Sequence, residues 1–197
     1  MRVPRRCPAL RSLPSALLGL LLLACGRGEP SRAPAGEGNP GGAATVDRTL
    51  LYPAEGDLLL HAVPVRLEAV GTAEEAMALV ARRYVENQPA EGFFSPFPEG
   101  CTVRALFLLP GGRLVVDLAG PVTAGSGTST EALRVYGLVD TLAANFPEVR
   151  SVRILVEGHQ VETLLGHLDV SGPIPPQAEY LGPELRASGL LAERRGG

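Results

Sequence analysis

The chain has 197 residues, of which 45% are hydrophobic and 20% charged, a composition typical of one globular domain with extensions. All 18 basic residues are arginine, which excludes Schiff-base chemistry and any phosphate-binding loop that needs a lysine. The formal net charge is −3 and no basic patch is interleaved with aromatic residues, so we expect no nucleic-acid partner.

The first 24 residues predict a secretory signal peptide. Four arginines precede an apolar run at 16–24 that is too short to span a bilayer in the usual way. The run ends Leu-Leu-Ala-Cys at Cys25 and resembles a bacterial lipobox, which implies a diacylglycerol on Cys25, cleavage after Ala24 and N-acylation, for example by palmitate. An ordinary signal followed by an incidental cysteine is the alternative. Several acyl chains on Cys25 would anchor the protein to a membrane.

Removal of the signal changes both the cysteine count and the charge. It removes four arginines and no acid, which moves the formal charge from −3 to −7. With Cys25 lipidated, Cys101 is the only free thiol, so no intramolecular disulfide is expected. We interpret Cys101 as a buried core residue rather than a nucleophile. The stretch 25–47 is rich in Gly, Pro and Ala and predicts a flexible tether behind the lipid.

The fold begins with several short strands and a helix. Leu50–Tyr52 predicts a first strand, 58–63 its return, and 65–70 an irregular or edge strand after Pro64. Thr72 and Glu75 form a capping box that opens a helix. The apolar face of this helix is predicted to consist of Ala76, Leu79, Val80 and Tyr84.

The segment 90–100 contains three phenylalanines among Gly, Pro and Ser. Phe93, Phe94 and Phe97 either fold back over the core as a lid or present an apolar surface to a partner. A predicted strand follows at 101–109, with Val103, Ala105, Phe107 and Leu109 on one face. Pro110 and Gly111 suit a type II turn that joins it to a strand at 113–118 in an antiparallel hairpin.

A strand–helix–strand unit organises the second half of the chain. After the loop 123–130, apolar residues recur with helical spacing from Ala132 to Phe146, and a strand follows at 152–156. Gly-rich loops entering a helix can bind an anion, but Thr128 and Glu131 predict a second capping box that uses those N–H donors.

The turns after this unit carry polar side chains. His159, Glu162, His167 and Asp169 do not have the spacing of a zinc motif, so we interpret them as surface residues and expect no metal or cofactor. Ser126 or Ser129 could pair with His159 or His167 in a hydrolase, but neither serine lies in a G-x-S-x-G sequence. We therefore expect no enzyme. Residues 175–197 are predicted to be a mostly disordered tail.

These elements predict an α+β domain at 48–174. Their order is β-α-β-β-α-β, which suits a two-layer sandwich with a mixed sheet of four to five strands and both helices on one face. The runs GRLVVDL from Gly112, LVDTL from Leu138, VRILVEG from Val152 and VETLLGHLDVSGP from Val161 together resemble the GerMN domain of bacterial sporulation and spore-germination lipoproteins.

The resemblance implies a non-catalytic interaction or assembly module in the cell envelope. Its partners would be the membrane, through the lipid on Cys25, and other envelope proteins or peptidoglycan, on the side facing the periplasm or the exterior; a homo-oligomer is compatible with this role. The alternative is a lipoprotein that binds a ligand or peptidoglycan. This chain holds one copy of the domain where the sporulation protein has two.

Overall fold

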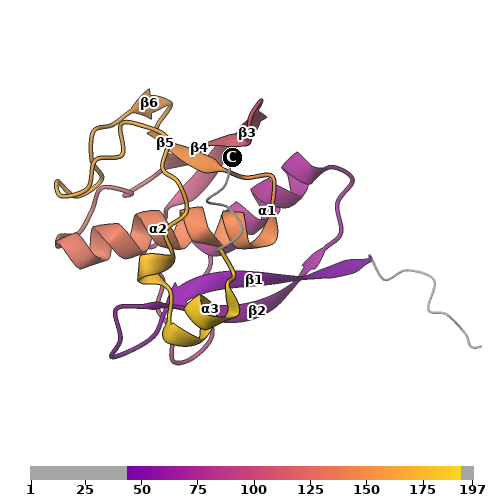
Figure 1. The fold of residues 1–197 in the computed structure, drawn as a ribbon. Helices are drawn as coiled ribbons and strands as arrows, with labels where there is room; N and C mark the ends of the chain where they lie inside the picture. The colour runs from indigo at the N-terminus through magenta and orange to yellow at the C-terminus, as the bar shows by residue number, and fades with distance from the viewer. Residues whose placement is uncertain (1–43, 192–197) are drawn as a thin grey trace, which may run out of the picture. The chain divides into compact units, whose positions relative to one another are not determined.

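The computed structural model describes residues 44–191 (Figure 1). The predicted signal peptide, the lipidated Cys25 and nearly all of the predicted tether lie outside these residues. The elements are β1 (Thr45–Pro53), β2 (Leu60–Glu68), α1 (Ala73–Val85), β3 (Thr102–Leu109), β4 (Arg113–Ala119), α2 (Thr128–Asn145), β5 (Ser151–Val156), β6 (His159–Gln160), a 3-10 turn (Ala178–Tyr180) and α3 (Pro183–Ser188). Strand β1 starts at Thr45, so the last predicted tether residues belong to the domain.

Strands β3 to β6 form a mixed sheet in that order. The β3–β4 hairpin is antiparallel, as predicted, and Gly111 at its turn has a φ of 81°, which a type II turn requires. Strand β5 runs parallel to β4, with α2 as the crossover, and pairs Val152 with Leu114. The strand–helix–strand unit expected from the sequence is therefore present.

Strands β1 and β2 form a separate two-stranded sheet, so the expected single sheet is divided in two. Figure 1 shows helices α1 and α2 between this pair and the four-stranded sheet. Strand β1 lies against α2, where Leu51 N–H donates to Thr141 Oγ1 at 2.9 Å and Thr49 N–H to Asn145 Oδ1 at 3.0 Å. These side chains satisfy the edge of β1 that a neighbouring strand would otherwise pair with.

Helix α1 has the predicted capping box between Thr72 and Glu75. Of its predicted buried face, Val80 and Tyr84 are buried, whereas Ala76 and Leu79 are only half-buried and Met77 and Ala81 are buried in their place. Helix α2 is buried on every side from 131 to 143, as expected of a helix between two sheets. Its predicted capping box is absent, since the N-cap is Gly127 with no side-chain hydrogen bond.

The predicted disorder of the C-terminal tail is wrong for its described part. Ile174 pairs with Val152 of β5, and Leu181 pairs in parallel with Leu60 of β2. Between these points the Tyr180 ring stacks on Tyr136 of α2, with centroids 4.5 Å apart. Because Leu181 and Leu191 are buried, a few apolar residues hold this Pro- and Gly-rich segment across both sheets.

Candidate functional site

The phenylalanine loop is mainly a lid. Phe97 is buried and packs edge-on against Tyr84 with ring centroids 6.1 Å apart, while Phe93 is half-buried and bridges to Ala54 of the loop after β1. Only Phe94 is exposed. Phe93, Phe94 and Phe97 therefore do not form one exposed surface for a partner, because Phe97 is buried in the core and Phe93 is half-buried.

Arg134 holds the lid and the loop before α2 in place, a role that the sequence did not reveal. Arg134 is 2% exposed. It donates to the carbonyl oxygens of Pro96 (2.8 Å), Val122 and Ala124 (3.0 Å), and its Cζ lies 5.8 Å from the Phe97 ring. Burial lowers the pKa of Arg134, and the carbonyl oxygens compensate for the lost water.

The polar residues considered for catalysis or metal binding are not assembled into a site. Ser126, Ser129, His159 and His167 are all exposed, and His159 Nδ1 lies 2.8 Å from the carbonyl oxygen of Glu157 in its own turn. Within residues 44–191 no three His, Cys, Asp or Glu side chains are placed to hold a metal ion.

The remaining candidate residues are also not part of a site. Asp169 accepts hydrogen bonds from the Ser171 backbone N–H and hydroxyl in its own turn, and Glu162 is exposed. Cys101 is a buried free thiol whose pKa is raised by burial, with Arg134 opposing that shift, so it is a core residue as predicted.

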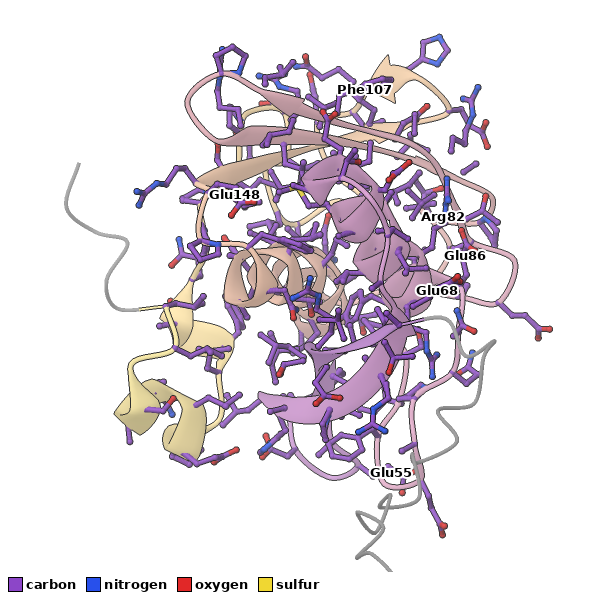
Figure 2. All side chains as sticks on the ribbon, turned by 90° about the vertical axis from the view of Figure 1, so that its right-hand side faces the viewer. Glu55, Glu68, Arg82, Glu86, Phe107 and Glu148 are labelled. Atoms are coloured by element: carbon purple, nitrogen blue, oxygen red, sulfur yellow. The ribbon has the colours of Figure 1, made fainter. Side chains whose placement is uncertain are left out.

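The outer face of the four-stranded sheet carries two of the five large hydrophobic residues that are exposed within the described residues. Both helices cover the opposite face, where Leu114, Val116 and Ile154 are fully buried. On the outer face Phe107 is 56% exposed and Leu109 is 41% exposed. Figure 2 shows Phe107 on the side of the sheet away from the helices.

A β-bulge at Arg104 creates this face. The register of β3 against β4 shifts between Val103 and Ala105, so Val103 points into the core while Ala105, Phe107 and Leu109 point outward. The sequence predicted all four on one face, which is wrong because the bulge adds one residue to the alternation.

Cross-strand pairing arranges the outer face in three rows. We call it the sheet face and define it by these rows: Leu109, Arg113 and Ser151; Phe107, Val115 and Arg153; Ala105, Asp117 and Leu155. Arg153 donates to Gln160 Oε1 at 2.8 Å and to the Ser171 carbonyl at 3.1 Å, which fixes its guanidinium. Arg104 forms ion pairs with Asp117 and Glu157 at 3.5 and 3.4 Å.

The sheet face carries a small positive charge on an acidic domain. It contains Arg113, Arg153 and Asp117, whereas the described residues outside β3 to β6 contain seven arginines and 17 acidic residues. Among the described arginines only Arg66 and Arg104 form ion pairs, so Arg113 and Arg150, like most of the others, have no acidic partner. Arg150 lies beside the β3–β4 turn, where its backbone N–H donates to the Gly112 carbonyl at 2.7 Å.

Both long edges of this sheet are partly covered. On β3, the free N–H of Leu108 donates to Glu74 Oε1 at 3.1 Å and that of Val103 to Glu86 Oε1 at 2.9 Å. At the other edge Ile174 pairs with Val152, and β6 pairs with the end of β5. A partner can therefore approach the face freely, whereas extending either edge strand would require displacing these contacts.

A second surface feature is a shallow groove of about 470 Å³ beside α1. It is lined by apolar residues with one charge of each sign: Val70, Gly71, Glu75, Ala78, Leu79 and Arg82. Figure 2 shows Arg82 on α1, apart from Phe107 on the sheet. No helix within residues 44–191 is long and apolar enough to cross a membrane.

Comparison with known proteins gives one family. The family model described as Germane, sporulation and spore germination, matches residues 49–162. No curated protein matches the chain. The matched range ends before the C-terminal segment that crosses the two sheets.

Solved structures with a similar fold include GerMN domains. The chain is similar to the tandem GerMN domains of the sporulation protein GerM from Bacillus subtilis, with 19% identity, a TM-score of 0.53 and 68% of this chain covered. It spans 45% of that tandem structure. It is also similar to a putative lipoprotein from Clostridium perfringens, with 15% identity, a TM-score of 0.50, and coverage of 68% of this chain and 89% of that chain. These similarities confirm the predicted α+β, GerMN-like fold.

Proposed function

The chain belongs to the Germane family, whose description is sporulation and spore germination, and we propose that it is a lipid-anchored, non-catalytic module that docks onto a protein of the bacterial cell envelope. The observation that carries the docking role is the sheet face, where Phe107 and Leu109 are exposed beside Arg113. Interfaces between proteins are enriched in aromatic residues and arginine, and this face has both.

The lipid anchor is supported by the sequence at Cys25. In the native host, the full chain should fractionate with membranes, and mass spectrometry should find a mature N-terminus at Cys25 carrying acyl chains. Cys25→Ser should release the protein from the membrane fraction. Cys101→Ala is the matched control, since it removes a thiol in the core and should leave the anchoring unchanged. A wild-type N-terminus without acyl groups would remove the anchor from the proposal.

The docking role is tested by crosslinking the intact cells before the full chain is purified. We expect a protein of the envelope to be recovered with the wild-type chain under at least one growth or sporulation condition. Recovery of no envelope protein under any condition would overturn the docking role. Turnover of a substrate by the purified chain would overturn the non-catalytic part.

A ligand- or peptidoglycan-binding role is the second candidate, and the groove beside α1 favours it. Val70 and Leu79 supply apolar contact there, and Arg82 could pair with a carboxylate. Sedimentation with purified cell wall tests this role. Leu79→Glu should abolish co-sedimentation if the groove binds wall material, whereas equal sedimentation of the chain with and without wall would exclude it.

A further inference from the structure

We infer that the sheet face binds a partner protein surface on which carboxylates surround an apolar centre. This inference rests on the proposed docking role and adds to it the location and the chemistry of the contact. Four observations carry it: an exposed apolar centre, arginines around that centre, an acidic remainder of the domain, and partly covered sheet edges.

The apolar centre lies in the middle row of the sheet face. Phe107 is 56% exposed, and its cross-strand neighbour Val115 is half-buried. Leu109 on the same strand extends this surface toward the hairpin turn. A large ring that is exposed in the free protein gains the most when a partner removes it from water, and such side chains dominate binding energy at interfaces.

The arginines give the face its preference for an acidic partner. Arg113 lies in the first row, and Arg150 lies beside the turn at the same end. Arg153 is held by Gln160 and Ser171, so little side-chain entropy is lost when it meets a carboxylate. Arg104 is already paired with Asp117 and Glu157 and therefore contributes little net charge.

The remainder of the domain strengthens this preference through orientation. It carries seven arginines against 17 acidic residues, and Figure 2 shows Glu55 at the opposite end of the molecule from Phe107. The excess of acidic residues outside the sheet repels an acidic partner, whereas the arginines of the sheet face attract it, which favours one orientation of encounter.

The partly covered edges decide the mode of binding. Glu74 and Glu86 accept hydrogen bonds from two N–H groups on the outer edge of β3, those of Leu108 and Val103, so a partner cannot add a strand along that edge without displacing two carboxylates. An acidic segment that approached this edge would also meet their negative charge. The partner therefore packs its side chains flat on the sheet face instead of extending the sheet.

The experiment places a photo-crosslinking phenylalanine analogue at position 107 of the full chain in the native host. We expect a covalent adduct with an envelope protein, and we expect the crosslinked peptide of that protein to lie among Asp and Glu. Arg113→Glu and Arg150→Glu should each lower the adduct yield by about tenfold, the effect of losing one close charge pair. Arg82→Glu makes the same charge change on α1 and should leave the yield unchanged.

A charge swap completes the test. Reversal of an acidic residue at the crosslinked site of the partner should restore the adduct of the Arg113→Glu variant. Yields that do not respond to Arg113→Glu or Arg150→Glu would overturn the acidic chemistry. An adduct with a second copy of this chain, or with peptidoglycan, would overturn the inferred partner in favour of that occupant.

The same analogue at positions 94 and 78 distinguishes a failure of the sheet face as the contact surface from a failure of the docking role itself. Phe94 is exposed in the lid loop, and Ala78 lines the groove beside α1. Adducts from these positions but not from position 107 would overturn the sheet face and leave the docking role in place. No protein adduct from any of the three positions would overturn both.

Discussion

Gly137 gives the Tyr84 side chain room against α2. A Cβ at position 137 would lie 1.9 Å from the Tyr84 hydroxyl oxygen and 3.0 Å from its Cζ. On an exposed helix, Gly→Ala would stabilise by about 1 kcal/mol through helix propensity. Here we expect Gly137→Ala to lower the free energy of unfolding by about 1–3 kcal/mol, because the added methyl group overpacks the core. Urea denaturation measures the change.

Tyr84→Phe provides the control for this prediction. The Tyr84 hydroxyl is buried and has no hydrogen-bond partner among the described residues, so its removal alone should cost little. In the Tyr84→Phe background, Gly137→Ala should be clearly less destabilising than in the wild type. Equal costs in the two backgrounds would show that the clash with the hydroxyl is not the cause.

Glu131 organises the loop after β6 from inside the protein. Its carboxylate is buried and accepts four backbone N–H groups, those of Leu164, Leu165, His167 and Leu168, at 2.7–3.1 Å. A glutamine at this position would turn an amide N–H₂ toward donors that need an acceptor. We expect Glu131→Gln to lower the free energy of unfolding by about 2–4 kcal/mol at neutral pH, measured by urea denaturation.

The pH dependence of this effect has a defined sign. Burial raises the pKa of Glu131, but the four backbone hydrogen bonds together lower it by more than burial raises it. The pKa in the folded protein therefore lies below 4.5. The stabilisation by the carboxylate is therefore present above about pH 4.5 and is lost as the pH falls through the folded pKa. The difference between wild type and Glu131→Gln should shrink over that range. Glu162→Gln, an exposed neighbour, should show no such trend.

At the scale of elements, α1 protects the edge of β3. Glu74 and Glu86 bond the N–H groups of Leu108 and Val103 from opposite ends of the helix. Without these carboxylates, β3 would present unpaired backbone groups beside the exposed Phe107. We expect the double variant Glu74→Ala, Glu86→Ala to self-associate with rising concentration, as measured by sedimentation velocity.

Glu91→Ala, Glu99→Ala is the matched control for the edge. Both residues are exposed in the lid loop, and their removal changes the net charge by the same amount. This control should sediment like the wild type. Self-association of both double variants would assign the effect to charge instead of to the open edge.

The sequence predicted those elements whose signals are local. The Thr72 capping box, the Pro110–Gly111 turn and the alternation in β4 and β5 each depend on neighbours within a few residues, and all three predictions are confirmed. Features that depend on distant partners were missed or misplaced. The bulge at Arg104 left no signal in the alternation of β3.

The missed parts of the candidate site have the same cause. Glu131 was assigned to a helix cap, but it bonds a loop more than 30 residues later, which local spacing cannot reveal. The separate β1–β2 sheet depends on Thr141 and Asn145 of α2 as edge partners. For the sheet face, the charge contrast between the four strands and the remainder was present in the sequence, but its meaning depended on knowing which face is uncovered.

At the scale of the whole molecule, the segment 173–191 joins the two sheets. It pairs with β5 at Ile174 and with β2 at Leu181, and Gly182 N–H donates to the Leu60 carbonyl at 2.8 Å. Leu181 is fully buried. We expect Leu181→Ala to lower the melting temperature and to cost about 2–4 kcal/mol of unfolding free energy, as buried leucines do. Leu58→Ala, an exposed leucine on the β1–β2 turn, should have little effect.

His61 adds a pH-dependent contact to this segment. Its Nε2 lies 3.0 Å from Asp57 of the β1–β2 turn and its Nδ1 lies 2.8 Å from Glu184 of α3, while its strand partner on β1 is Tyr52. Partial burial lowers the pKa of His61, but the hydrogen bonds to Asp57 and Glu184 outweigh this, so the folded value is above 6.5. The stabilisation is therefore fully present below about pH 6.5 and is lost as the pH rises through the folded pKa.

Hydrogen exchange of the amides at 181–186 measures this contact locally. After correction for intrinsic exchange rates, their protection should fall as the pH rises through the folded pKa of His61, because the neutral imidazole donates only one of its two hydrogen bonds. His61→Gln should remove most of this pH dependence, and His159→Gln, at an exposed turn, should keep it. If protection in His61→Gln still followed the wild-type pH profile, the contact between α3 and the β1–β2 turn would be controlled by another group.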